Sequence, residues 1–140
     1  MIRSEVEALI GRHRQAFAAR DPDRIAADHA EHGTFESPAA AIVHGREAIA
    51  GVYRYWLQAF PDMEFTWRTP LVDGARVALF WRFRGTLDGD FFGHTGHGVR
   101  VEFPGAADYV VSPGGIVSAK HVFDFTGSLI AAGVLKVKNV

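Results

Sequence analysis

Apolar side chains in the first sixty residues recur at helical spacing in three separate stretches. From Val6 to Phe17 they fall at intervals of three and four, interrupted only by His13, so this stretch predicts an amphipathic helix. Asp21-Pro22 is a typical helix start, with a capping carboxylate before a proline, and it predicts a short second helix that ends near Ala30. A third amphipathic helix is predicted between Gly45 and Phe60, because proline follows directly.

From residue 63 onward the apolar positions change from helical spacing to alternation, which is typical of strands with one buried face. Pro104-Gly105 is expected to kink or bulge the strand that contains it, and Ser112 to Gly115 are expected to form a hairpin turn. The expected strands lie at 34–37, 63–72 with a break at Pro70, 77–84, 99–111 and 116–125, and a short helix at 128–132, capped by Asp124, follows them.

Helices that precede a meander of strands predict an α+β layer fold with mostly antiparallel neighbours. A chain of 140 residues is long enough to bury one continuous core, so a single domain spanning 1–140 is expected.

Composition narrows the classes of function. A hydrophobic content of 48% with 22% charged residues is ordinary for a globular domain. The formal net charge is −1 and no stripe of lysine or arginine occurs, which argues against nucleic acid or an anionic membrane surface as the main partner. No cysteine is present, which excludes a disulfide framework and a thiolate nucleophile. The first residues lack the apolar core of a signal peptide and no apolar run approaches the roughly 20 residues that cross a bilayer, so a cytoplasmic protein is expected.

The last expected strand carries one polar residue among apolar ones. If the strand is regular, Val117, Ala119, His121, Phe123 and Phe125 share one face, because side chains alternate along a strand. A titratable ring on an otherwise apolar face costs free energy unless something pairs with it. The sequence therefore predicts a partner for His121.

Asp108 is the partner that the sequence suggests. It lies in the apolar stretch 106–110, where an unpaired carboxylate is unusual. Counting back from the hairpin turn places Asp108 roughly opposite His121. In such a pair the carboxylate fixes the tautomer of the imidazole and makes the ring a general acid or base near neutral pH. A buried, satisfied pair with a structural role is the alternative.

Other polar and aromatic side chains are candidates for ligand contact. Ser37 can orient a ligand by hydrogen bonding, but no Gly-x-Ser-x-Gly elbow surrounds it, which argues against a serine nucleophile. His13 can reach the same sheet face, or only pack at a helix–sheet boundary. Four aromatic residues are most simply core, with some of them lining an apolar cavity: Tyr53, Trp56, Trp81 and Phe123.

Two pairs of histidines have a spacing that suggests metal binding, His29 with His32 and His94 with His97. Neither pair has a third ligand at a recognisable spacing, and the second pair lies in a glycine-rich loop. We therefore expect no metal site.

Several short motifs, weak individually, follow one another in an order and spacing that resemble a known family. They are Phe17-Ala18-Ala19-Arg20-Asp21, Phe35-Glu36-Ser37-Pro38, His44-Gly45-Arg46-Glu47-Ala48-Ile49, Ala59-Phe60-Pro61-Asp62, Gly115-Ile116-Val117 and Asp124-Phe125-Thr126-Gly127-Ser128-Leu129. Over nearly the whole chain they are similar to the SnoaL-like polyketide cyclases of the nuclear transport factor 2-like superfamily, which also contains the ketosteroid isomerases. The resemblance implies a cone-shaped, strongly curved mixed sheet, with three N-terminal helices enclosing a pocket, usually as a homodimer.

The resemblance also implies site residues. In the cyclases an aspartate on the last strand is the acid/base of an intramolecular aldol ring closure that needs no cofactor or metal, accompanied by a histidine on the preceding strand and an asparagine before the proline of the first strand. Those places hold His121, Asp108 and Ser37 here, so the histidine and the aspartate are exchanged. Against the isomerases, the oxyanion tyrosine falls at His13, the general base at Ser37 and the second oxyanion acid at Asp108.

Three hypotheses follow. The first is a cofactor-independent enzyme on a hydrophobic carbonyl compound, in which Asp108 orients His121 as the proton shuttle and His13 and Ser37 bind substrate oxygens. The second is a binding or dimerisation module for a small apolar molecule. The third is an epoxide hydrolase or isomerase of the same superfamily, the former with an Asp–Arg–Asp arrangement to which Asp108 and Arg82 could contribute.

Overall fold

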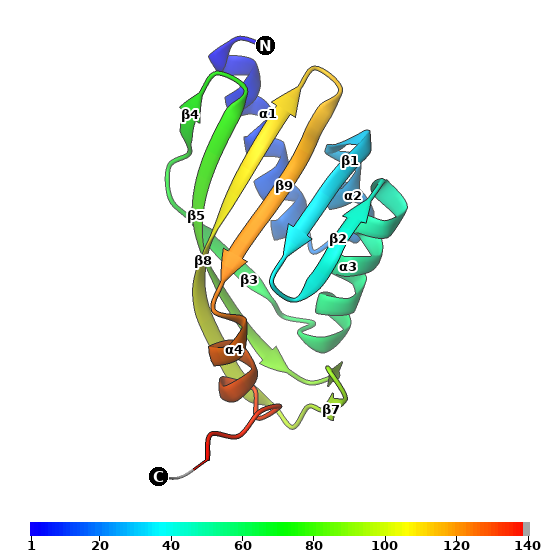
Figure 1. Ribbon diagram of the computed structural model, residues 1–140, viewed down its shortest axis with the longest axis vertical. Helices are drawn as coiled ribbons and strands as arrows, with labels where there is room; N and C mark the ends of the chain where they lie inside the picture. Colours follow the sequence, from blue (N-terminus) through cyan, green and yellow to red (C-terminus); the bar gives the residue numbers. More distant parts are fainter. Residues whose placement is uncertain (139–140) are drawn as a thin grey trace.

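One strongly curved sheet with helices on its concave side forms the body of the protein in the computed structural model, which describes residues 1–138 (Figure 1). The helices are α1 (Arg3–Ala18), α2 (Pro22–Ala27), α3 (Arg46–Ala59) and α4 (Phe125–Ala131). The strands of the sheet are β1 (His29–Ser37), β2 (Ala40–His44), β3 (Glu64–Trp67), β4 (Leu71–Asp73), β5 (Arg76–Leu87), β8 (Val99–Ser112) and β9 (Gly115–Phe123). A separate small hairpin joins β6 (Asp90–Phe91) and β7 (His94–Thr95).

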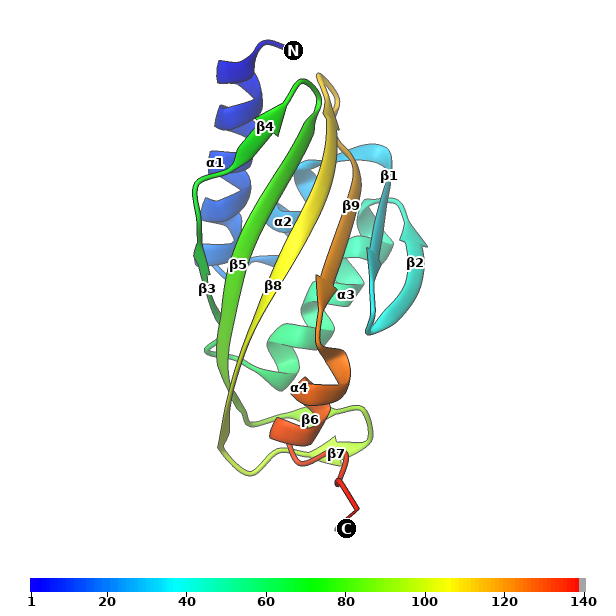
Figure 2. The same cartoon turned by 60° about the vertical axis from the view of Figure 1, so that its left-hand side comes forward.

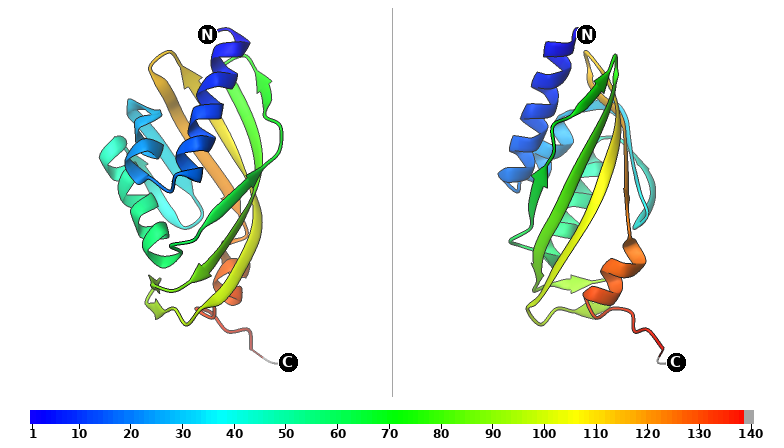
Figure 3. Two further views of the ribbon diagram at one scale, coloured as in Figure 1. Left: turned by 180° about the vertical axis from the view of Figure 1, so that it is seen from behind. Right: turned by 90° about the vertical axis from the view of Figure 1, so that its left-hand side faces the viewer.

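The strand order is β2-β1-β9-β8-β5-β3, and β4 pairs with β5 beyond the end of β3. Every pair in the sheet is antiparallel except β1 with β9, which run parallel. Seen from behind, α1, α2 and α3 lie across the same face of the sheet, and the edge-on view shows how the sheet bends around them (Figure 3). The predicted α+β class, with a curved, mostly antiparallel mixed sheet, is confirmed; α4 is an additional short helix at the end of β9.

The helices begin where local capping chemistry places them. The carboxylate of Asp21 accepts hydrogen bonds from the backbone N–H groups of Asp23 and Arg24, at 3.1 and 3.2 Å, and so starts α2. Gly45 precedes α3 with φ of +85°, a conformation that favours glycine. Asp124 caps α4 as expected, although this helix begins at Phe125, earlier than the spacing of its apolar residues indicated. No helix of the described chain is both long and apolar enough to span a membrane.

Two expectations about the strands are wrong. The first strand is longer than 34–37 and is followed by β2, whose alternation is weak because most of its side chains are exposed. The expected kink at Pro104-Gly105 is also wrong, because β8 pairs with β5 without interruption from Val99 to Val110. Since β9 ends opposite Gly105, Pro104 lies where β8 has one neighbouring strand, and the missing N–H of proline costs least there.

A β-bulge in β9 decides which side chains face the helices. Val111 pairs with Ile116 but Val110 pairs with Ser118, so Val117 is an extra residue without a partner on β8. Val117 is 42% exposed, and the expectation that it shares a face with His121 is therefore wrong. Beyond the bulge the alternation is regular, and Ala119 and His121 are buried.

The core lies between the concave face of the sheet and α1, α2 and α3. It is rich in aromatic rings that meet edge to face, for example Phe17 with Tyr53 and Phe60 with Phe83, both at 5.1 Å between centroids. The turned view in Figure 2 shows α3 behind β8 and β9, with α4 below it, and the β6–β7 hairpin next to α4 at the foot of the sheet. These elements surround the lower half of the concave face, where the site lies.

Candidate functional site

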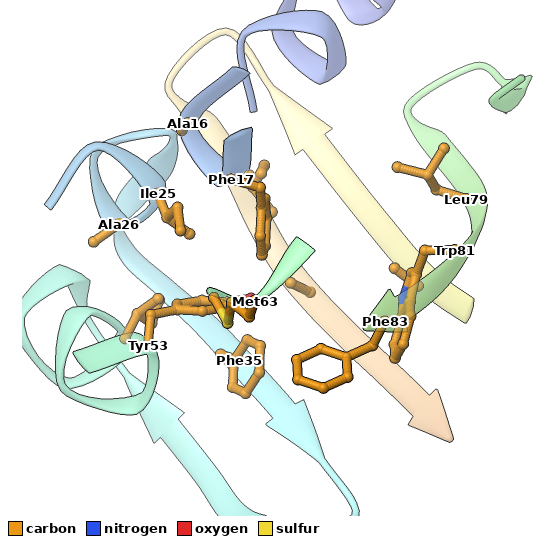
Figure 4. Close-up of a cluster of buried hydrophobic side chains, with 14 of the residues drawn as sticks. Ala16, Phe17, Ile25, Ala26, Phe35, Tyr53, Met63, Leu79, Trp81 and Phe83 are labelled. Carbon is orange, nitrogen blue, oxygen red and sulfur yellow. The ribbon is translucent and has the colours of Figure 1, made fainter. Parts of the chain in front are cut away.

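A pocket opens between the concave face of the sheet and α3. Its walls are almost entirely aromatic and aliphatic, and the cavity inside them measures about 40 Å³. Figure 4 shows part of this wall, with Phe17, Phe35, Tyr53, Met63, Trp81 and Phe83 turned toward a common centre. The complete lining consists of Phe17, Phe35, Ser37, Val52, Tyr53, Trp56, Met63, Phe65, Trp81, Phe83, Phe103, His121 and Phe123.

His121 is the one imidazole on this wall, and it is 6% exposed. Its ring lies among the rings of Phe35, Tyr109 and Trp81, with centroids 5.3, 5.8 and 6.0 Å away. Burial, together with the smaller effects of the neighbouring His13 and His29, lowers the pKa of His121 to about 3. The ring is therefore neutral at pH 7 and presents an unprotonated nitrogen.

The expected pairing of Asp108 with His121 is wrong. Asp108 lies opposite Lys120 on the convex face of the sheet, whereas the residue opposite His121 is Ala107. The Asp108 carboxylate accepts two hydrogen bonds from Arg76, at 3.0 Å from Nε and 2.8 Å from Nη2, and this ion pair lowers its pKa. The bulge at Val117 is the physical reason, because a regular register counted from the hairpin turn would place Asp108 on the same face as His121.

The structure contains a different histidine–aspartate pair, His13 with Asp28. Nδ1 of His13 lies 3.0 Å from Oδ2 of Asp28; the imidazole is 1% exposed and the carboxylate 16% exposed. His13 lies on the buried face of α1, and Asp28 follows the last turn of α2. The sequence contains one indication of this pair, because His13 interrupts the apolar positions of the first helix. The spacing of residues along the chain did not indicate Asp28 as its partner.

A third buried histidine lies beside this pair. His29 is fully buried at the start of β1, its Nδ1 lies 3.0 Å from the carbonyl oxygen of Ile25, and its ring centroid is 5.4 Å from that of His13. Burial lowers the pKa of His29 to about 4, and the charge of His13 acts in the same direction. Tyr109 lies between His13 and His121, with centroids 5.7 and 5.8 Å away.

Five of the side chains named from the sequence as ligand contacts lie on the pocket wall, and the sixth, His13, does not. The five are Ser37, Tyr53, Trp56, Trp81 and Phe123. Ser37 accepts a hydrogen bond from the backbone N–H of Ala39 at 3.2 Å, which leaves its own hydroxyl hydrogen free for a ligand. That these residues bind a substrate stays a prediction.

Sequence reasoning missed most of the phenylalanines that complete the wall. Phe65, Phe83 and Phe103 alternate along their strands, and this pattern marked a buried face without separating pocket from core. Phe35 was visible only as part of a short strand motif. Its contact with both Tyr53 and His121 depends on the parallel pairing of β1 with β9, which the sequence does not reveal.

The histidine pairs do not form metal sites in residues 1–138, where no three histidine, aspartate or glutamate side chains gather around a common point. His29 is buried whereas His32 is exposed, so the two do not share a site. His94 and His97 have ring centroids 6.1 Å apart near the β6–β7 hairpin, away from the pocket lining.

Comparison with known proteins gives a family match and many structural neighbours. The model of the SnoaL-like domain matches residues 10–119. AclR from Streptomyces galilaeus superimposes with a TM-score of 0.82 at 22% identity, covering 97% of this chain and 85% of AclR. IdmH from Streptomyces antibioticus, named as a candidate polyketide cyclase, gives a TM-score of 0.75 at 25% identity, covering 91% of this chain and 97% of IdmH.

A third structural neighbour is described with a different activity. SalBIII, described as an epoxide hydrolase/cyclase-like enzyme in pyran ring formation in the polyether salinomycin, gives a TM-score of 0.73 at 18% identity, covering 88% of this chain and 93% of SalBIII. No curated protein matches the chain significantly in sequence.

Proposed function

Because the chain belongs to the SnoaL-like domain family, we propose that it is a cofactor-independent acid–base enzyme that acts on a hydrophobic carbonyl compound. The observation that carries the proposal is the position of His121, a neutral imidazole on the wall of an otherwise aromatic pocket. An apolar pocket with a few placed polar groups is the usual form of a small-molecule site. A titratable group with a strongly shifted pKa in such a pocket is a candidate for proton transfer.

The proposed chemistry is removal of a proton from the carbon next to a carbonyl group. His121 takes the proton, and the electron pair of the broken C–H bond forms an enolate. The enolate carbon attacks a second carbonyl of the same molecule and closes a ring, as in an aldol reaction. His121 then returns its proton to the alkoxide that results, so no external acid or oxidant is consumed.

Two hydroxyl groups on the wall can stabilise the enolate oxygen. Ser37 and Tyr53 line the same pocket as His121, and Tyr53 is neutral because burial raises the pKa of its hydroxyl. Hydrogen-bond donors aimed at developing negative charge in a water-poor site are an effective means of catalysis. In this proposal they replace the contacts that the sequence led us to expect from His13.

The low pKa of His121 limits the chemistry that it can perform. A buried imidazolium is unfavourable on its own, so His121 becomes an effective base only where a negative charge forms next to it at the same time. Enolate formation meets this condition, because the imidazolium and the enolate appear together. Acidic carbon sites, as in β-dicarbonyl compounds, are the substrates that such a base can deprotonate.

The volume of the pocket also limits the substrate. A cavity of about 40 Å³ is far smaller than the several hundred Å³ of typical drug-sized sites. A ligand with one or more rings therefore requires movement of the half-buried side chains at the wall, such as Val52, Phe65 and Phe123. We expect apolar ligands with one face that can stack on aromatic rings.

The experiment is a screen of aryl- and alkyl-substituted β-diketones and β-ketoesters in D₂O, with hydrogen–deuterium exchange at the α-carbon followed by NMR. The wild-type chain is expected to accelerate exchange of at least one compound, and His121→Gln to lose 10²- to 10⁴-fold in kcat with KM nearly unchanged, as for removal of a general base. Exchange that is unchanged in His121→Gln contradicts the proposal.

The same experiment separates the two alternatives. A binding module would bind members of the panel by calorimetry without exchange, and its affinity would survive His121→Gln. For the epoxide hydrolase, none of the described residues that line the pocket is an aspartate or an arginine, and the pair of Arg76 with Asp108 lies on the exposed convex face. Diol formation from an epoxide panel would favour that alternative in spite of this arrangement.

We further propose the homodimer that the family resemblance implies, formed through the convex face of the sheet. Phe80 and Val122 are 46% and 52% exposed there, and apolar patches of this kind mark interaction surfaces when they are contiguous. Light scattering on the wild type and on a Phe80→Asp, Val122→Asp double variant tests this, with a monomeric variant as the expected result.

The cytoplasmic location, and the absence of nucleic acid and membrane partners, stay predictions.

A further inference from the structure

Behind the pocket wall lies a buried group of polar side chains that the proposed reaction does not use. His13, His29 and Tyr109 are 1%, 0% and 0% exposed, and each has a polar atom without a hydrogen-bond partner within the described chain. These atoms are Nε2 of His13, Nε2 of His29 and Oη of Tyr109, and Nε2 of His121 is in the same condition. Buried polar atoms are rarely left unpaired, so four such atoms in neighbouring rings indicate a connected set.

The contacts of the rings indicate which nitrogen atoms are hydrogen-bond donors and which are acceptors. Nδ1 of His13 faces the Asp28 carboxylate and Nδ1 of His29 faces backbone carbonyl oxygens of Ile25 and Ala26, so both rings carry their proton on Nδ1. Their Nε2 atoms are therefore acceptors. The hydroxyl of Tyr109 stays protonated, since burial and the charge of Asp28 raise its pKa, and its one hydrogen can be donated to Nε2 of the neighbouring His13.

We propose that Tyr109 joins His121 to the His13–Asp28 pair as a proton relay. In the resting state Nε2–H of His121 donates to Oη of Tyr109, whose hydroxyl donates to Nε2 of His13, whose Nδ1–H donates to Asp28. Successive rings meet edge to face with centroids 5.8 and 5.7 Å apart, and the relay requires these side chains to shift until the named atoms come within hydrogen-bond distance.

With donors and acceptors in this order, Nε2 of His121 carries the proton and Nδ1 is the unprotonated nitrogen. Nε2 is the atom of the His121 ring that is fully buried without a hydrogen-bond partner in the described chain. The relay thus fixes the tautomer in which Nδ1 is free to accept a proton from a ligand. In the proposed function Nδ1 is the base, so the catalytic use of the relay rests on that function. The tautomer of His121 does not depend on the proposed function.

The relay also removes the charge from the pocket wall. When Nδ1 of His121 gains a proton, Nε2 passes its own proton to Oη of Tyr109, and the hydroxyl proton of Tyr109 moves to Nε2 of His13. His121 and Tyr109 are then neutral again, and His13 is an imidazolium 3.0 Å from the Asp28 carboxylate. One proton has entered and none is lost, and the positive charge rests beside the one carboxylate of the group.

Asp28 connects this arrangement to solvent. Its side chain is 16% exposed and lines a surface groove together with Leu9, Arg12 and the hairpin turn at Ser112–Gly115. The groove lies at the end of the sheet where β8 and β9 meet, whereas the pocket opens beside α3 (Figure 1). Protons can therefore reach His121 from the side opposite the ligand.

The experiment is a long-range ¹H–¹⁵N spectrum of the imidazole nitrogens in the ¹⁵N-labelled full-length chain near pH 7.5, with signals assigned by single histidine-to-glutamine variants. The expected result is a proton on Nε2 of His121 and on Nδ1 of both His13 and His29. Tyr109→Phe, which removes one hydroxyl, is expected to shift His121 toward the Nδ1–H tautomer and leave His29 unchanged. Tyr53→Phe is the matched control, since it removes another buried hydroxyl from the same core and is expected to leave the His121 tautomer unchanged.

A wild-type His121 with its proton on Nδ1 overturns the relay even if Tyr109→Phe fails to fold. A tautomer that is the same in Tyr109→Phe and wild type also overturns it. Where a carbonyl compound is turned over, Tyr109→Phe is expected to lower kcat about tenfold with KM unchanged, and an unchanged kcat would contradict a catalytic use of the relay. If no compound is turned over, the proposed function fails, while the tautomer experiment still decides whether the relay exists.

Discussion

The two faces of the β8–β9 pair hold titratable side chains in opposite environments. On the concave face Ala107 lies opposite His121, and one position further along each strand, on the convex face, Asp108 lies opposite Lys120. His121 is 6% exposed and neutral, whereas the Asp108 side chain is 43% exposed and charged, with Arg76 as its partner. Titratable residues of the same strand pair that lie on opposite faces therefore differ completely in what they can do.

The contrast extends to two of the carboxylates that have a basic partner, Asp108 and Asp28. Asp108 forms a solvated ion pair with Arg76, of a kind that contributes little to stability or chemistry. Asp28 holds a fully buried imidazole and lies at the start of a buried polar group. The pairing that the sequence placed at the pocket thus exists in another form, deeper in the core and with different residues.

The largest expected effect comes from moving the aspartate by one position. Ala107→Asp places a carboxylate at a site that is 2% exposed, opposite Leu79 and His121, and we expect it to lower the free energy of unfolding by about 3–5 kcal/mol. Ala106→Asp puts the same group on the convex face and is expected to cost less than about 1 kcal/mol. Urea denaturation of the two variants measures the difference, and equal losses would contradict the assignment of faces.

The pH dependence of stability should also separate the two faces. His29 and His121 have pKa values of about 4 and 3 in the fold, below the ordinary 6.5. Below pH 6.5 the unfolded chain therefore binds more protons than the folded chain. The stabilisation by the neutral histidines is complete above that pH, and the free energy of unfolding falls toward pH 4 by up to about 1.4 kcal/mol per pH unit for each histidine. The stabilising contribution of Asp108, whose pKa is lowered, is complete above its ordinary value near pH 4 and is lost only below that pH.

Variants identify the groups responsible for this pH dependence. Denaturation between pH 4 and 8 is expected to give a shallower slope for His29→Gln, and an unchanged slope for Asp108→Asn. A wild-type stability that stays constant from pH 8 to 5 would show that the two buried histidines are not held in the neutral form.

Loss of the buried carboxylate should have a moderate effect. Asp28→Asn replaces the charged acceptor of the His13 Nδ1–H group with a neutral amide oxygen, and because hydrogen bonds to charged groups are stronger than neutral ones, we expect a loss of about 1–2 kcal/mol. Thermal and urea unfolding measure the change. If Asp28→Asn is as stable as the wild type, the hydrogen bond to His13 does not hold the ring in place.

The smallest effect is expected on the convex face. Asp108→Asn breaks an ion pair whose side chains are 70% and 43% exposed, and we expect a loss below about 1 kcal/mol that disappears in high salt. Unfolding in 0.05 and 1 M NaCl tests this. A loss as large as that of Asp28→Asn, or one that persists in high salt, would mean that the two faces are not as different as their exposures indicate.

Much of the fold could be predicted from the sequence because local signals determine it. The caps at Asp21 and Asp124, the change from helical to alternating spacing, and the turn at Ser112–Gly115 each depend on a few adjacent residues. The weakly alternating β2 and the parallel contact between β1 and β9 escaped prediction, because such pairing depends on residues distant in sequence.

The site could be predicted only in part, and one residue explains the largest error. Val117 is an ordinary strand residue, and nothing in its surroundings indicates that it bulges out of β9. The bulge changes the register by one, which turns Asp108 away from His121 and turns Tyr109 toward it. Part of the aromatic wall was easier to anticipate, since helical or alternating spacing marked Tyr53, Trp56, Trp81 and Phe123, whereas it did not separate the other phenylalanines from the core.

The most direct test of the central claim, that a ligand binds in the concave pocket against His121, is a crystal structure with a bound enolate mimic. A substituted phenol or naphthol that binds in solution is a suitable ligand. We predict that its oxygen or reactive carbon lies within about 3.5 Å of Nδ1 of His121, between Phe35 and Trp81, with the half-buried side chains of the wall displaced. A ligand seated instead in the larger groove of about 660 Å³ beside Asp108 and Arg76, with the concave pocket unchanged, would contradict the claim.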